Sequence, residues 1–147
     1  MFRERLTLGR NYVETLVLSL MNLEYQSLGS GRESEVAVYV ARTLEEAVCS
    51  LGYVDEFVRT TYVKSLQRVF KGMFPDIPEP SWDSCYNFEK LVEHLWDYRG
   101  RVLGVSPDLL TRSEKTRKIA PLAAKVVRTA VIGTFAKLGL ITMGSRG

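Results

Sequence analysis

Positively charged side chains at short spacing are the feature of this sequence best suited to binding a ligand. Several cations on one surface attract phosphate groups by Coulomb forces without needing a sequence motif, and neighbouring hydroxyl groups can donate to phosphate oxygens. Four such cations lie between residues 112 and 118, among three Ser and Thr residues of the 111–116 segment. The residues predicted to contact nucleic acid are Arg99, Arg101, Arg112, Lys115, Arg117, Lys118, Lys125 and Arg128.

The charge of the chain is divided between two parts. Residues 99–147 hold ten Lys and Arg against two Asp and Glu, a net charge of +8, whereas residues 1–98 have a net charge of −5. A basic segment of this kind is typical of a surface that meets a polyanion, most commonly nucleic acid. The alternative is that its cations pair with acidic protein groups, and residues 75–98, with a net charge of −5, offer such groups within the same chain.

Residues suited to catalysis or metal binding are sparse. His94 is the one histidine of the sequence, with Glu93 beside it and Asp97 one helical turn further on, an arrangement that could serve a general base. The sequence places no Ser or Cys nucleophile near His94 and offers no second histidine for a metal site. Residues 29–32 lack the spacing of a phosphate-binding loop and predict a turn. We therefore predict a protein that is not an enzyme and that uses no cofactor or metal.

Aromatic side chains gather just before the first of the basic residues. Trp82, Tyr86, Trp96 and Tyr98 lie close together in the sequence, and rings beside arginines can stack the bases of a single strand. More often such rings anchor a core or an interface. Trp96 falls on an apolar helical stripe and is predicted to be buried, whereas Trp82 falls in a proline-rich segment and is predicted to be exposed.

The two cysteines, Cys49 and Cys85, have no Cys or His neighbour at metal-ligand spacing. The sequence leaves a disulfide between them open, but the lack of a secretory signal pattern favours two reduced thiols in a cytoplasmic protein. No apolar stretch reaches the ~18–20 residues of a transmembrane helix, so no membrane partner is expected. The few amide side chains and many charged ones suit a thermophile.

Apolar residues at helical spacing predict helices over about 11–27, 31–50, 55–71, 84–102 and 121–138, with a short basic helix after Ser106. Asp55 is a predicted N-cap, and Gly139 is predicted to end the last helix. Residues 74–83 hold three of the five prolines and predict a loop. Residues 140–143 could add a short strand.

The predicted fold is all-α, a compact bundle of five or six helices in one domain of 147 residues, with a short terminal β stub as an option. The helix over 11–27 is apolar on more than one side. A bundle helix needs only one apolar face, so this helix is either central or part of an interface.

Together these features predict a non-enzymatic helical protein that binds the phosphate backbone of nucleic acid with low sequence specificity, as a small subunit of a larger ribonucleoprotein complex. Small helical subunits of CRISPR-type effector complexes are similar in size and charge character. The alternative is a protein–protein adaptor or self-assembling module, a homo-oligomer for example, whose basic face docks on an acidic partner. The sequence does not choose between DNA and RNA.

Overall fold

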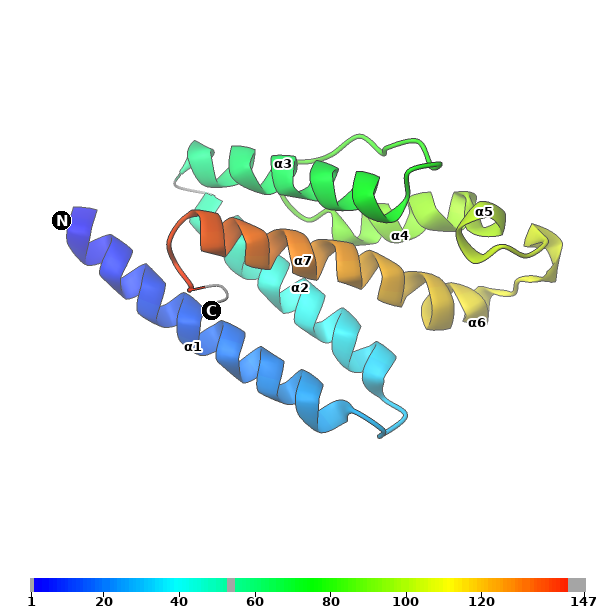
Figure 1. Cartoon of the computed structure of the whole chain (residues 1–147), viewed down its shortest axis with the longest axis horizontal. Helices are drawn as coiled ribbons and strands as arrows, with labels where there is room; N and C mark the ends of the chain where they lie inside the picture. Colours follow the sequence, from blue (N-terminus) through cyan, green and yellow to red (C-terminus); the bar gives the residue numbers. More distant parts are fainter. Residues whose placement is uncertain (1, 53–54, 143–147) are drawn as a thin grey trace.

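The computed structural model describes residues 2–52 and 55–142, which form a bundle of helices without a strand among them (Figure 1). This confirms the predicted all-α fold. The elements in chain order are α1 (Phe2–Ser27), α2 (Glu33–Gly52), α3 (Glu56–Met73), α4 (Phe88–Asp97), α5 (Arg99–Leu103), a 3-10 turn (Pro107–Leu109), α6 (Arg112–Glu114), a π turn (Lys115–Ile119) and α7 (Ala120–Lys137). Residues 140–142 are not a strand, and Met143 lies outside the described residues.

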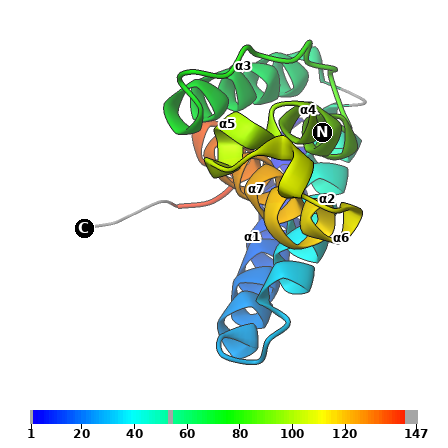
Figure 2. The ribbon, with the colours of Figure 1, turned by 90° about the vertical axis from the view of Figure 1, so that its right-hand side faces the viewer.

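α7 is the central helix of the bundle. It packs against α2, α3 and α4, and the view along the molecule shows it enclosed among them (Figure 2). Its buried side chains are mostly small, which lets the neighbouring helices approach closely. They are Ala120, Ala123, Ala124, Val126, Val127, Ala130, Val131, Thr134 and Phe135.

The helical rod Arg112–Lys137, which ends in α7, is long and apolar enough to cross a membrane by length and composition alone. The prediction that no stretch would reach this length is therefore wrong for this helix. More than half of its most apolar window is buried inside the bundle, and a core helix passes the same test. The central position of α7 accounts for its apolar character.

The rod widens for one turn just before Pro121. Proline has no backbone N–H, and its ring clashes with the carbonyl group four residues earlier in a regular helix. Here the N–H of Ala120 donates to the carbonyl of Lys115, five residues back, and a π turn results. The helix predicted from the sequence starts at Pro121. In the structure, the wider turn accommodates the proline within one continuous helical segment, so residues 112–118 continue directly into α7.

Two helix ends lie where the sequence predicted them. The Asp55 side chain accepts a hydrogen bond of 2.9 Å from the N–H of Phe57 and so caps α3. Gly139 adopts a left-handed conformation with a φ of 73° after the last turn of α7. The next N–H, of Leu140, then donates to the carbonyl of Phe135 at 2.8 Å, which satisfies an end carbonyl of the helix.

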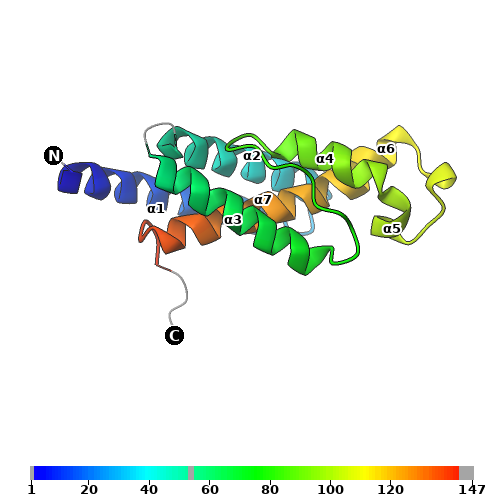
Figure 3. The ribbon, with the colours of Figure 1, turned by 90° about the horizontal axis from the view of Figure 1, so that it is seen from above.

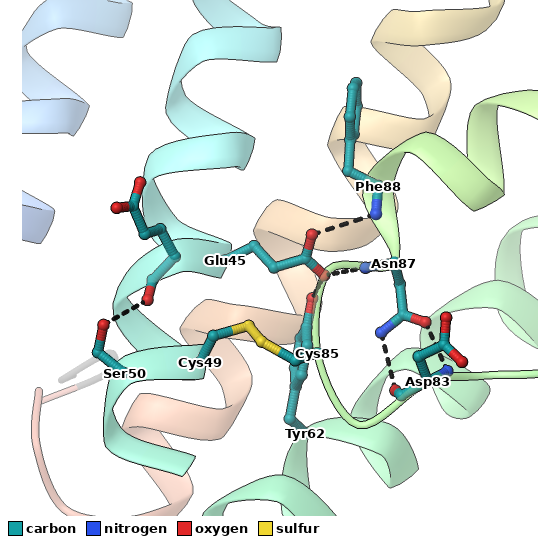
Figure 4. Close-up of a disulfide and its surroundings, with 9 residues drawn as sticks. Glu45, Cys49, Ser50, Tyr62, Asp83, Cys85, Asn87 and Phe88 are labelled. Atoms are coloured by element: carbon teal, nitrogen blue, oxygen red, sulfur yellow. Dashed lines mark hydrogen bonds between the residues drawn. A yellow bond between two sulfur atoms is a disulfide. The ribbon is translucent and has the colours of Figure 1, made fainter. Parts of the chain in front are cut away.

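Cys49 and Cys85 form a disulfide, so the prediction of two reduced thiols is wrong (Figure 4). Their Cα atoms are 5.4 Å apart, within the usual range for a disulfide. Cys49 lies near the end of α2, and Cys85 lies in the loop between α3 and α4. Residues 36 apart in sequence are thus tied together, a relation that sequence spacing could not reveal.

α1 lies at the edge of the bundle, beside α2 (Figures 1 and 3). Val13, Val17 and Leu20 are buried and form its packing face. Of the two explanations for its apolar surplus, a central position is therefore wrong. The other explanation, an interface, stays a prediction.

Candidate functional surfaces

The basic residues before α7 contact acidic side chains of this chain. The Lys115 ammonium group forms an ion pair with Glu93 of α4. Arg117 and Lys118 both pair with Glu114, at 2.7 and 3.3 Å. Hydrogen bonding from Lys118, followed by the charges of Arg117 and Lys118, lowers the pKa of the Glu114 carboxyl group below its ordinary value. These three cations are thus engaged within the molecule.

Arg128 of α7 joins the central helix to α1. Its guanidinium group donates two hydrogen bonds to the carboxylate of Glu24, at 2.6 and 2.8 Å. This paired geometry is the strongest that arginine makes with a carboxylate. Both side chains are partly buried, so Arg128 holds two helices together and offers little charge to an external ligand.

Arg99 and Arg101 lie against the aromatic rings that could have stacked bases. The Arg99 guanidinium carbon lies 4.4 Å from the ring centroid of Trp96, and its Nη1 donates to the Trp96 carbonyl at 3.0 Å. Arg101 lies 5.8 Å from the ring of Tyr98 and donates to the carbonyl of Asp76 at 3.3 Å. Both arginines therefore form cation–π contacts with these rings and hydrogen bonds to backbone carbonyl groups.

Three of the eight predicted residues, Arg101, Arg112 and Lys125, are exposed and form no ion pair within the described part of the chain. Of these, Arg101 has the ring and carbonyl contacts given above. Arg112 lines a groove of about 870 Å³ between α2, α4 and the start of the rod. The charged residues of that groove are Arg42, Arg112, Lys115 and Arg117 with Glu35, Glu89 and Glu93. Because its charges nearly balance, the groove is a poor match for a polyanion. Nucleic-acid binding by the eight residues stays a prediction.

His94 and Trp82 have packing roles. His94 Nε2 lies 2.6 Å from the Pro78 carbonyl oxygen, so the histidine holds the loop before α4. The Trp82 ring packs edge-on against Phe70 at 5.7 Å and donates its N–H to Glu79 at 3.0 Å. Trp82 is thus partly buried, and the prediction of an exposed ring is wrong. Trp96 is also partly buried. Within residues 2–52 and 55–142, no group of three or more metal-ligating side chains is present.

A buried polar network that sequence reasoning missed lies beside the disulfide (Figure 4). Glu45 of α2 is 2% exposed and accepts hydrogen bonds from the N–H groups of Asn87 and Phe88, at 2.8 and 3.1 Å, and from the Tyr62 hydroxyl group. The Asn87 side chain in turn bonds twice to the backbone of Asp83. A carboxylate at the start of α4 satisfies free N–H groups and interacts favourably with the helix dipole.

The most exposed apolar surface lies on α1. Four of the ten large hydrophobic side chains that are exposed in the described structure belong to this helix, with Leu18 68% and Tyr25 75% exposed, and a fifth, Leu28, follows its last residue directly. Leu18, Met21 and Tyr25 share one stripe of α1, and Leu28, in the turn directly after the helix, continues the same spacing of three, four and three residues. We call these four residues the α1 stripe. The buried face of α1 lies beside this stripe, because Val17 lines one groove together with Leu18 and Met21. The apolar surface of α1 is therefore wider than its packing face.

A groove of about 490 Å³ runs along one side of the α1 stripe. Leu18 and Met21 form one wall, and Ile132 of α7 with Ile141 after it forms the other. Glu14 and Arg128 also line the groove, but Glu14 is paired with Arg10 and Arg128 with Glu24. The groove is therefore a mainly apolar surface that extends the α1 stripe towards the central helix.

No protein-family model, no curated protein and no solved structure matches this chain.

Proposed function

We propose that this chain is a non-enzymatic, self-assembling helical module in which α1 of one copy pairs with α1 of a second copy. The observation that carries this proposal is the α1 stripe, three large apolar side chains exposed on a peripheral helix with Leu28 directly after it. Full burial of such a side chain is worth about 1.5–3 kcal/mol. Contiguous exposed apolar surface of this kind commonly marks a site of protein association.

The charge around the stripe favours an uncharged partner surface. Between residues 15 and 31, Glu24 is the sole charged side chain, and Arg128 neutralises it. A polyanion or a charged peptide would find no complementary group there, and its own charges would lose water without compensation. A second α1 stripe offers the apolar and uncharged surface that this face requires, and a two-fold axis brings the same patch of both copies together.

The spacing of the stripe favours an antiparallel pair of helices. The intervals of three, four and three residues read the same in both directions, so reversal places Leu18 opposite Leu28 and Met21 opposite Tyr25 of the second copy. Glu14 occupies the next position of the same stripe. Arg10 pairs with Glu14 at 2.8 Å and compensates part of its charge. A parallel pair would still place two Glu14 carboxylates side by side, whereas an antiparallel pair keeps them at opposite ends of the interface.

Replacing Leu18 and Tyr25 with Lys should separate the two copies. The double substitution removes four large side chains from the paired surface, so association should weaken at least about 10⁴-fold. Size exclusion with light scattering at tens of micromolar should give twice the 16.7 kDa chain mass for the original protein and the mass of one chain for the variant.

The matched control is Val105→Lys with Leu109→Lys, which replaces two apolar residues exposed elsewhere and should leave the pair intact. The measurement belongs in ~1 M salt, where the screening length is about 3 Å and charge pairing between copies is suppressed. A mass of one chain for the original protein, or a pair that survives Leu18→Lys with Tyr25→Lys, contradicts the proposal.

A further inference from the structure

A second exposed stripe lies on α3, and it is basic. Phe57, Lys64, Arg68 and Lys71 are all exposed, and Phe57 is 65% exposed. Their spacing of seven, four and three residues places the four side chains within about 60° of one another around the helix. The stripe spans about 21 Å along the helix, at 1.5 Å per residue. We call it the α3 stripe.

The cations of α3 have few partners within the protein. The helix carries four Lys and Arg and one acidic residue, Glu56 in its first turn. Lys71 lies 3.6 Å from Glu79, but Lys64 and Arg68 form no ion pair with any residue in the described ranges. This contrasts with the predicted basic residues before α7, most of which are engaged with acidic groups or aromatic rings of the same chain.

The stripe is held on a rigid support. The opposite face of α3 is buried through Val58, Tyr62, Leu66 and Phe70, and the helix packs against α7 and α2. Figure 3 shows α3 along the outside of the bundle, in front of α7. The four exposed side chains therefore keep a fixed order, with the aromatic ring first and the cations after it.

We propose that the α3 stripe binds single-stranded nucleic acid, with a base stacked on the Phe57 ring and phosphates beside Lys64, Arg68 and Lys71. Cations with few internal partners attract the backbone, and an exposed ring adds a contact that every base can make. A duplex keeps its bases stacked inside and could not use the ring. An acidic protein segment would pair with the cations but would leave the phenyl ring without a complementary surface. This proposal is independent of α1 pairing, because it concerns a different helix.

Fluorescence anisotropy with a labelled 20-nucleotide poly(dT) or poly(U) strand at low salt tests the proposal. The original protein should bind, with a log–log salt slope of about −2 for three phosphate contacts on a single strand. Lys64→Glu with Arg68→Glu should weaken binding at least about tenfold. Arg112→Glu with Lys125→Glu is the matched control, because it changes the charge equally and should leave the affinity within about threefold.

Phe57 provides the second readout. Phe57→Ala should weaken binding about fivefold or more, as expected for the loss of one stacked base, whereas Phe57→Tyr should keep the affinity. All the exchanged side chains are exposed, so melting temperatures should stay within a few degrees. A lack of binding by the original protein overturns the proposal, and so does unchanged binding by Phe57→Ala. It is also overturned if both charge variants lose affinity equally, or if only the Arg112 and Lys125 variant loses it. Finally, poly-glutamate should not displace the labelled strand as well as unlabelled strand does, and equal displacement would contradict the proposal.

Discussion

At the scale of single residues, Glu45 shows how one buried carboxyl group organises a region. It joins α2, α3 and the start of α4 through three hydrogen bonds, and the Cys49–Cys85 disulfide lies beside it (Figure 4). A buried acceptor with all partners present stabilises one arrangement strongly, because the loss of any partner leaves a desolvated group unpaired. We therefore assign Glu45 a structural role: it positions α4, and it does not bind a ligand.

Tyr62→Phe tests this assignment. The change removes one hydrogen bond to a charged group and should lower the free energy of unfolding by about 1.5–3 kcal/mol. Burial, together with the charge and the hydrogen bond of Glu45, raises the pKa of Tyr62 well above its ordinary value near 10. Above pH ~10 the unfolded chain loses the Tyr62 proton while the folded protein keeps it, so the stability that Tyr62 contributes falls as pH rises.

Urea unfolding of both proteins from pH ~7 to ~11 provides the measurement. The difference in stability between the original protein and Tyr62→Phe should be constant below pH ~10 and should shrink above it. A difference that grows at alkaline pH, or no difference at neutral pH, would show that the Tyr62 hydroxyl group does not stabilise the fold through Glu45.

At the scale of elements, the disulfide holds the loop before α4 against α2. A link between residues 36 apart should stabilise the fold by about 4 kcal/mol through the entropy of the unfolded chain. Reduction should therefore lower the melting temperature by roughly 10 °C, and Cys49→Ser with Cys85→Ser should melt at the same temperature with and without reductant. Equal melting of the original protein in both conditions, or free thiols in protein prepared without reductant, would contradict the pairing.

The helices were largely predictable, because apolar spacing and end signals such as Asp55 and Gly139 act locally. The roles of the charged residues were not. Which acid meets Arg128 or Lys115 depends on helix packing between residues distant in sequence, as with Glu24 and Glu93. The cytoplasmic and thermophile assignments stay predictions. They are compatible with a disulfide, because intracellular proteins of hyperthermophiles often contain them.

The α1 stripe and the α3 stripe could not be predicted from the sequence for a related reason. Leu18 belongs to a helix whose surplus apolar residues fit either a central or an interfacial position, and the structure alone shows that α7 is the central helix instead. Lys64 and Arg68 lie in a part of the chain whose net charge is negative, so overall charge concealed a basic face. The net charge and hydrophobicity of a whole segment average over the different faces of its helices, and only the folded structure shows which face is exposed.

At the scale of the whole molecule, the two proposed surfaces lie on different sides. Figure 2 shows α3 at one end of the cross-section and the turn between α1 and α2 at the other, with α7 between them. Pairing through α1 would therefore leave α3 of both copies open to solvent. A two-fold assembly would then present two basic stripes, and linking two weak sites raises the apparent affinity for a strand long enough to reach both.

Spin-label distances measured by pulsed dipolar spectroscopy test antiparallel α1 pairing most directly. Both native cysteines are in the disulfide, so a cysteine introduced at Asn22 or Arg10 can be labelled alone. Packed helix axes lie 8–10 Å apart, so labels at Asn22, near the middle of the stripe, should lie within about 25 Å of each other. Labels at Arg10 should lie about 40 Å apart, from 1.5 Å per residue on either side of the centre. A lack of intermolecular distances at tens of micromolar, or an equally short distance at Arg10, would contradict the account.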